Sequence, residues 1–312
     1  MLTRRAVLGS AAGLALGGVL GSACTPRSNL VAEPKKLMAV TMDDFILNFD
    51  IRLAPLARNE AILGALKAHN HKAGAFVTAS NVNNAAGRRV MQSWSDAGHL
   101  IANHTWSHLN ATDEPAARIH DDILKNEAYL SQFSQFEKIF RFPYLAEGGT
   151  PEKVEAYRSF LDAHGYANAP VTIDSIDWFT SSRLEARLRE NPDADVSGYR
   201  DYYVKAVREI SQQKHLLALR LGYENLPHTL LVHHNILNGL FLRDVMDALV
   251  SDGWGFVDAK TALAHPLYKE RPQTPNRGRS VLSVLAQEKD IDPMFPDAYL
   301  GWGKKTMDSL GL

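Results

Sequence analysis

The feature that most constrains this chain is an alternation of short apolar runs with longer amphipathic stretches, which begins at Leu37. The apolar runs have the length of buried strands, and the stretches between them have the length and spacing of helices. Strands that alternate with helices form parallel sheets covered by those helices. We therefore expect an α/β fold whose strands close, or nearly close, on themselves. The seven expected strands are Leu37–Thr41, Gly74–Thr78, Leu100–Asn103, Ile139–Phe142, Ala167–Ile173, Thr229–His233 and Gly255–Asp258.

The stretches between and beyond these strands predict the rest of the organisation. The expected helices are Ala54–Ala68, Ala86–Ala97, Glu114–Phe133, Pro151–His164, Tyr199–Leu221 and Leu240–Ser251. The segment from Phe179 to Leu226 is long for one crossover, so we expect a helical insertion before the sixth strand. Residues 268–312 are expected to form a surface extension with a short apolar helix near Val281–Gln287.

The first residues indicate an export address. Arg4 and Arg5 precede 18 uncharged residues, Ala6 to Ala23, which end in small side chains. This pattern is typical of a secretory signal peptide over residues 1–23, and the arginine pair also resembles a twin-arginine signal. An uncleaved membrane anchor and a simple cleaved signal are the alternatives.

Cys24 is the single cysteine, so it has no partner for an internal disulfide. Its position directly after the signal resembles the lipidated cysteine of bacterial lipoproteins. We therefore expect residues 24–36 to be a lipid-anchored tether and Cys24 to hold the chain on the extracytoplasmic face of a bacterial membrane, facing the periplasm or the cell surface. The net charge is −1 for the full chain, which gives no sign of a nucleic-acid partner.

A chain of 312 residues buries a full core without a structural metal, so any metal is expected to serve catalysis. Asp43 and Asp44 follow the first expected strand, where one carboxylate can bind a cation and the other can act as a base. A helix cap or a turn is the alternative. His104 and His108, after the third strand, are four apart and would face one side of a helical turn, where they can share a metal. Surface histidines are the alternative for that pair.

Three further groups of polar residues follow later strands. Arg141 can fix a carboxylate base by a charge-assisted hydrogen bond, and the Tyr144 N–H after Pro143 can stabilise an oxyanion. Core packing is the alternative for Tyr144. An aspartate of the segment 174–178 can orient a catalytic histidine. His233, at the end of the sixth strand, can protonate a leaving amine, whereas its neighbour His234 is expected to have no chemical role.

These groups, in this order and each at a strand end, resemble the five motifs of the polysaccharide deacetylases, the NodB-like carbohydrate esterase family 4. The resemblance covers residues 37–267. It implies a distorted (β/α)₇ barrel and a divalent cation, usually Zn²⁺ and in some members Co²⁺ or Ni²⁺.

The resemblance also implies roles for single residues. Asp44, His104 and His108 would hold the cation, with Asp43 as general base and Arg141 tuning it. Tyr144 would offer its backbone N–H to the oxyanion. Asp177, with Asp174 as the alternative, would orient His233 as general acid, and Trp178 and Leu231 would line the acetate pocket.

One departure concerns the substrate pocket. The family commonly has glycine after the aspartate pair, and this chain has Phe45, which we expect to narrow the cleft or shift the substrate. The resemblance implies an enzyme that removes N-acetyl or O-acetyl groups from a polysaccharide of the cell envelope or extracellular matrix. A hydrolase of small non-sugar amides, which Phe45 would favour, and a non-catalytic carbohydrate-binding lipoprotein are the alternatives. The oligomeric state is not predicted.

Overall fold

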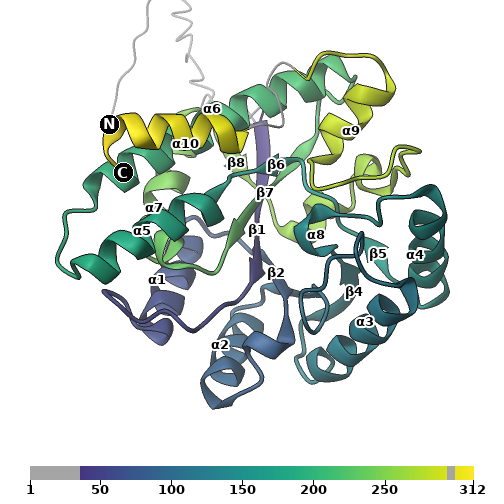
Figure 1. Cartoon of the computed structure of the whole chain (residues 1–312), viewed down its shortest axis with the longest axis horizontal. Helices are drawn as coiled ribbons and strands as arrows, with labels where there is room; N and C mark the ends of the chain where they lie inside the picture. Colours follow the sequence, from purple (N-terminus) through teal and green to yellow (C-terminus); the bar gives the residue numbers. More distant parts are fainter. Residues whose placement is uncertain (1–35, 294–298) are drawn as a thin grey trace, which may run out of the picture. The chain divides into compact units, whose positions relative to one another are not determined.

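A parallel sheet organises the computed structural model, which describes residues 36–293 and 299–312 (Figure 1). Its hydrogen-bonded order is β5-β4-β3-β2-β1-β7-β6, with β8 paired to β1 outside this path. The sheet curls into a half-barrel, which confirms the expected α/β barrel architecture. The expected signal peptide, Cys24 and nearly all of the tether lie outside the described residues.

The first strand is the centre of the sheet. β1 (Lys36–Asp44) is buried without interruption from Met38 to Asp43, as a strand covered on both faces must be. It pairs along its length with β7 (Pro227–His233), a register that sets Asp43 directly beside His233. On its other side β1 pairs first with β8 (Trp254–Phe256) and then with β2 (Gly74–Val77).

The sheet is open at one place, where the predicted fifth strand is wrong. Instead of one strand over Ala167–Ile173, the chain forms β5 (Ala167–Asn168), which pairs with β4 (Phe136–Phe140), and β6 (Ile173–Asp174), which pairs with β7. Pro170 lies between them and has no N–H to donate to a ladder. The sheet therefore continues from β3 (Leu100–Asn103) to β5, and β6 joins at the opposite edge.

Helices cover the sheet at nearly the expected positions. Thr150 caps α4 with its hydroxyl, which accepts from the Lys153 N–H, and Pro151 occupies the first turn, as the sequence indicates. The helices are α1 (Pro55–Ala68), α2 (Ala85–Asp96), α3 (Ala116–Leu130), α4 (Pro151–Ala163), α5 (Asp177–Glu190), α6 (Ser197–Arg220), α7 (Ile236–Ser251), α8 (Ala259–Leu263), α9 (Val281–Glu288) and α10 (Tyr299–Leu310). The short 3₁₀ turns are η1 (Ala79–Asn81), η2 (Pro143–Leu145) and η3 (Pro266–Lys269). Within the described ranges, none of these helices has the length and apolar character that a bilayer crossing requires.

The inserted segment is helical, as expected, and forms α5 and α6. Both helices pack on α7, and α6 also packs on α9. Tyr203, Val207 and Ile210 of α6 are fully buried in the main core. The insertion therefore contributes a wall of the core beside β7.

The expectation that residues 268–312 lie only on the surface needs correction. Val281, Leu282 and Leu285 of α9 are buried against Leu217 of α6 in a second apolar cluster. Met307 of α10 is fully buried in the main core. The C-terminal segment buries apolar surface because α6 presents an apolar face that the barrel helices do not cover.

Candidate active site

The polar residues singled out in the sequence meet in one pocket at the carboxyl ends of the strands. Its cavity measures about 400 Å³, within the usual range for small-molecule sites. Asp43 and Asp44 end β1, His104 follows β3, and His233 ends β7. The pocket is lined by Asp43, Asp44, His104, His108, Phe142, Tyr144, Leu145, Asp174, Trp178, Leu231, His233 and Gly278.

Asp44, His104 and His108 form a cluster that can hold a metal ion. Asp44 Oδ1 lies 3.4 Å from His104 Nε2 and 3.0 Å from His108 Nε2. One ligand atom from each residue falls within 4.8 Å of the other two. Two imidazoles and one carboxylate are a ligand set typical of catalytic zinc, with positions left for water and substrate.

The two histidines come from a loop, so the predicted helical turn is wrong. Thr105 and His108 both have positive φ, at 61° and 56°, which no right-handed helix contains. Side chains hold the loop instead: the Thr105 N–H donates to Asn103 Oδ1, and the His108 N–H donates to Thr105 Oγ1, both at 3.0 Å. These local bonds replace the helical ladder and still bring both rings to Asp44.

The environment of the cluster fits a cation. The Nδ1 atom of His104 lies 2.9 Å from the Arg141 carbonyl oxygen, so the ring donates there and its Nε2 lone pair faces Asp44. Asp44 Oδ1 is buried and accepts no hydrogen bond from the described residues. Burial opposes ionisation of Asp44, but the two neighbouring imidazoles and the charge of His233 hold its pKa well below the usual value. A buried, ionised oxygen without a donor is what a metal ion would satisfy.

Asp43 is held beneath the pocket by Arg141. Arg141 Nη1 donates to Asp43 Oδ1 at 2.6 Å and to Thr41 Oγ1 at 2.9 Å. Its Nε donates to the Ala169 carbonyl at 3.1 Å, and its guanidinium stacks 3.7 Å from the Phe76 ring centroid. The other carboxylate oxygen of Asp43 lies 3.7 Å from His104 Nε2. One oxygen is therefore fixed by the guanidinium, and the other faces the metal cluster.

His233 is positioned and charged by Asp177. The Nδ1 atom and the backbone N–H of His233 both donate to the Asp177 carboxylate at 2.8 Å. Asn235 and Asn238 donate their amides to the same carboxylate at 2.8 and 2.6 Å. Burial disfavours the imidazolium, but Asp177, with smaller effects from Asp44 and Asp43, raises the pKa of His233 to about 10. Its Nε2 lies 4.0 Å from Asp44 Oδ2, inside the pocket.

The apolar wall and the rim of the pocket include three predicted residues. Leu231 is buried, whereas Trp178 and Tyr144 are 46% and 57% exposed. Tyr144 has φ 58° and ψ 12°, a left-handed backbone that costs energy for a side chain other than glycine. Its ring packs 4.5 Å from the ring of His108.

The prediction that Phe45 narrows the cleft is wrong. Phe45 has no exposed surface and packs on Trp94 and His234, with ring centroids 5.0 Å apart in both pairs. The chain turns at the end of β1, where Asp44 and Phe45 have φ of 72° and 59°. This turn aims the ring into the core, and Phe45 does not line the pocket.

Two other expectations concern neighbours of the predicted residues. His234 is buried, and burial with the charge of Arg58 lowers its pKa to about 3, as expected for a residue without a chemical role. Asp174 lines the pocket but accepts the Ile176 N–H at 3.0 Å and does not bond His233. Asp177 is thus the carboxylate that contacts the histidine.

Several residues of the site were not predicted. Asn235 caps α7, and the amides of Asn235 and Asn238 both donate to the Asp177 carboxylate. The sequence signal for the cap was an asparagine directly before the apolar start of a helix. Gly278, which lines the pocket from the C-terminal segment, had no such signal because it lies far from every motif.

Comparisons with known proteins point to the same family that the sequence motifs resemble. A model of the polysaccharide deacetylase family matches residues 31–164. The chain is 27% identical over 145 residues to the peptidoglycan-N-acetylglucosamine deacetylase of Bacillus cereus, covering 46% of this chain and 47% of that protein. It is 30% identical over 117 residues to the peptidoglycan-N-acetylglucosamine deacetylase PgdA of Listeria monocytogenes, covering 37% of this chain and 23% of that protein. The chain thus spans half or less of the length of these relatives.

Solved structures with the same fold include active and inactive proteins. A carbohydrate esterase 4 pseudoenzyme from Bacillus anthracis aligns at TM-score 0.52 and 18% identity, over 74% of this chain and 66% of that one. The peptidoglycan N-acetylglucosamine deacetylase Bc1960 aligns at TM-score 0.51 and 19% identity, over 72% and 87%. At such identities the likeness shows the fold alone. The family model therefore supports, over residues 31–164, the resemblance to the polysaccharide deacetylases, the NodB-like carbohydrate esterase family 4, and the solved structures share the fold.

Proposed function

We propose that the chain is a metal-dependent hydrolase that removes acetyl groups from an acetylated polysaccharide of the cell envelope or extracellular matrix. The observation that carries this proposal is the convergence of Asp44, His104 and His108 with the paired carboxylate Asp43 and the charged His233 around one pocket. The two curated relatives are named for deacetylation of peptidoglycan N-acetylglucosamine, which favours an N-acetylated glycan.

Asp44, His104 and His108 would hold the divalent cation, for which Zn²⁺ suits two imidazoles and a carboxylate, with Co²⁺ and Ni²⁺ as alternatives. When bound, such a cation polarises the acetyl carbonyl and lowers the pKa of a water molecule. The remaining chemistry belongs to residues of the chain.

Asp43 is the proposed base. Arg141 fixes one of its oxygens at 2.6 Å, so the other can take the proton of the attacking water. The guanidinium holds the carboxylate in one orientation. The Tyr144 N–H would donate to the oxyanion that forms on the carbonyl oxygen.

His233 is the proposed acid. Its Nδ1–H is committed to Asp177 at 2.8 Å, so the Nε2–H remains for the departing sugar amine. The raised pKa of His233, about 10, supplies a protonated ring at neutral pH. Trp178 and Leu231 would enclose the acetate methyl group.

The alternatives differ in how well the site supports them. A small-amide hydrolase loses its main argument, since Phe45 lies in the core. A non-catalytic carbohydrate-binding protein has the precedent of the Bacillus anthracis pseudoenzyme on the same fold, but here every proposed catalytic position holds a competent residue.

The test is release of acetate from acetylated chito-oligomers. We expect turnover that a chelator abolishes and Zn²⁺ restores, and an Asp43→Asn protein that binds Zn²⁺ like the parent but turns over at least a hundredfold more slowly. A His104→Ala protein should lose both metal and turnover. Parental turnover in Asp43→Asn would refute the base assignment, and no acetate from any acetylated glycan would favour the non-catalytic alternative.

We also propose that the chain is exported and anchored through a lipid on Cys24. The support is the sequence alone: the charged start, the apolar stretch and the small residues before the cysteine. Cys24→Ala should move the protein from the membrane fraction to the soluble extracytoplasmic fraction. Retention in the membrane would instead favour an uncleaved anchor.

A further inference from the structure

Part of the active-site wall comes from the C-terminal segment of the chain. Among the described residues that line the pocket, Gly278 alone lies beyond the end of β7. The polysaccharide deacetylase model matches the chain only up to residue 164, so this part of the wall lies outside the matched region. We call residues 276–281 the clasp, because they are bonded to the loop of residues 142–149, which carries Tyr144 and Leu145 to the same pocket.

The clasp and the loop are joined at three points. The Glu147 N–H donates to the Asn276 carbonyl at 2.8 Å, and Ala146 forms an antiparallel bridge with Arg277. The Arg277 guanidinium donates to the Gly149 carbonyl at 2.6 Å. The position of the loop beside the pocket therefore depends on the position of the clasp.

The shape of the clasp is set by the buried side chain of Asn276. Its amide donates to the Arg279 carbonyl at 2.8 Å, and its oxygen accepts the Arg279 N–H at 2.9 Å. These two bonds close a turn that contains Gly278, whose φ is 101°. Glycine adopts such a backbone at no steric cost, whereas a residue with a side chain does not.

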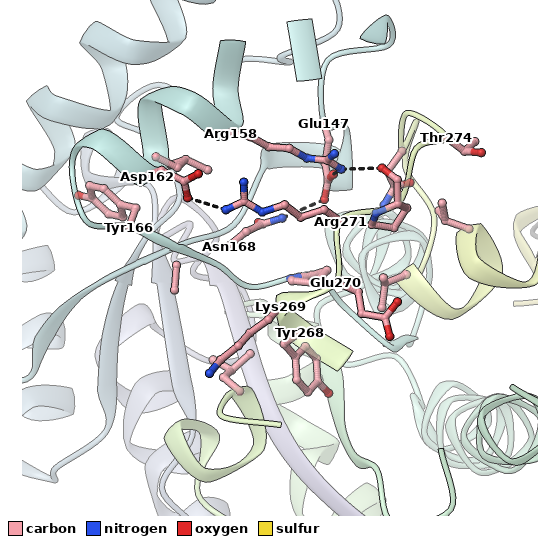
Figure 2. A pocket seen from close by; sticks show the side chains of 18 residues that line it. Glu147, Arg158, Asp162, Tyr166, Asn168, Tyr268, Lys269, Glu270, Arg271 and Thr274 are labelled. Atoms are coloured by element: carbon pink, nitrogen blue, oxygen red, sulfur yellow. Dashed lines mark hydrogen bonds and ion pairs between the residues drawn. The ribbon is translucent and has the colours of Figure 1, made fainter. Parts of the chain in front are cut away.

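The clasp is attached to the rest of the fold at both ends. Behind it, Val281 is buried in the apolar cluster that α9 shares with α6. Ahead of it, the Pro272 carbonyl accepts from Arg158 of α4 at 2.7 Å, and Arg271 pairs with Asp162 of the same helix (Figure 2). The clasp is therefore a fixed element against which the loop can be held.

The loop contains a strained backbone next to the pocket. Tyr144 and Leu145 have φ of 58° and 53° in succession, and each costs free energy for a residue with a side chain. Surrounding structure must hold such a conformation. Gly278 contributes directly, since a Cβ atom placed on it would lie 3.1 Å from the Tyr144 carbonyl oxygen. The bare backbone of Gly278 thus packs against the backbone of Tyr144.

We propose that the clasp is a working part of the active site and that Gly278 is a positioning residue, which holds the Tyr144 backbone so that its N–H is directed at the oxyanion. The role of the N–H rests on the proposed function, whereas the contact between clasp and loop rests on the geometry alone. A side chain at position 278 would displace the Tyr144 carbonyl by a few tenths of an ångström and turn the N–H out of line.

The test compares two glycines with similar backbone strain. Gly278 and Gly222 have φ of 101° and 90°, but a Cβ atom on Gly222 would meet nothing within 4 Å. Both Gly278→Ala and Gly222→Ala should lower the melting temperature. In zinc-loaded protein, Gly278→Ala should also lower kcat for acetylated chito-oligomers about tenfold, a part of the roughly hundredfold loss that follows removal of an oxyanion donor. KM should stay within about twofold of the parental value, and Gly222→Ala should keep the parental kcat.

Hydrogen exchange of the backbone amides of residues 142–149, measured by mass spectrometry, gives a readout that does not require activity. Gly278→Ala should speed exchange in this loop, because the loop opens more often, and Gly222→Ala should not. Arg277→Ala removes an exposed side chain and its bond to Gly149, so it should also speed exchange. Arg277→Lys should restore slow exchange, since an ammonium group can donate to the same carbonyl.

The outcomes separate the clasp from the proposed function. Parental exchange in Gly278→Ala, or in Arg277→Ala should the first variant not fold, overturns the proposal. Faster exchange with parental kcat in an active enzyme overturns the positioning role. If the parent releases no acetate from any acetylated glycan, yet the variants exchange faster in the loop, the proposed function fails while the contact between clasp and loop stands.

Discussion

His233 and His234 are neighbours in sequence and opposites in chemistry. The pKa of His233 is raised to about 10, and that of His234 is lowered to about 3. The first ring lines the pocket against Asp177, and the second is buried beneath it against Phe45. The residue type is the same, so the difference comes entirely from the surroundings.

The difference arises where β7 ends. Successive side chains of a strand point to opposite sides, and so His233 enters the pocket while His234 enters the core. Three aspartates, Asp177, Asp44 and Asp43, favour the charged ring of His233 against the effect of burial. Burial disfavours the charged ring of His234, no carboxylate offsets this effect, and the charge of nearby Arg58 disfavours the charged ring further. The comparison teaches that a histidine next to a catalytic one need not share its function.

The largest expected effect separates the two histidines by function. His233→Gln should lower kcat a hundredfold to ten-thousandfold, because no group remains to protonate the leaving amine, while the melting temperature changes little. His234→Gln should leave kcat near the parental value and lower the melting temperature. Equal losses of kcat in both variants, measured by acetate release, would contradict the division between pocket and core.

Removing the carboxylate that charges His233 should make its chemistry pH-sensitive. The raised pKa keeps the ring protonated at pH values below about 10, so the acid is available at neutral pH. In Asp177→Asn the pKa should fall toward about 6.5. Activity at pH 8 should then drop about thirtyfold, the loss of the protonated fraction. A pH–rate profile that keeps its basic limb in place would show that Asp177 does not set the charge.

The buried ring of His234 should make the folded state less stable as the pH falls. The folded-state pKa of His234, about 3, lies below the unfolded value of about 6.5. The contribution of the neutral His234 ring to the free energy of unfolding is therefore complete above pH 6.5 and is lost as the pH falls toward 3. Between pH 8 and pH 5 the loss should be about 2 kcal/mol of unfolding free energy.

His234→Leu, which cannot titrate, should lose less stability over the same pH interval, measured by urea unfolding. An unchanged pH dependence would mean that other groups, such as the buried His71, His99 and His228, whose pKa values are also lowered, account for it.

The smallest expected effect on stability and KM is that of replacing Phe45, which was wrongly predicted to lie in the substrate cleft. Phe45→Leu should cost about 1 kcal/mol of stability through reduced packing on Trp94, with KM for acetylated chito-oligomers unchanged. A several-fold change in KM would return Phe45 to the substrate pocket.

Much of the fold could be predicted, because strand and helix periodicity reflects burial by neighbours close in sequence. β1, β3 and α4 lie within a few residues of their predicted bounds. The errors arose where one local interaction overrides the pattern. Pro170 divides the fifth predicted strand, and the bonds of Thr105 replace a helical turn. The burial of α9 was not predicted because α9 packs on the apolar face of α6, which lies far away in the sequence.

The sequence by itself determined which side chains are available and at which strand ends they stand, because parallel strands bring their carboxyl ends to one edge. Only the tertiary structure decided the charge, the burial and the position of those side chains. Three properties depend on distances between elements far apart in the chain: the charge of His233, the burial of Asp44 and the packing of Phe45 in the core. Burial and Coulomb interactions act through those distances, and they fall off over a few ångströms.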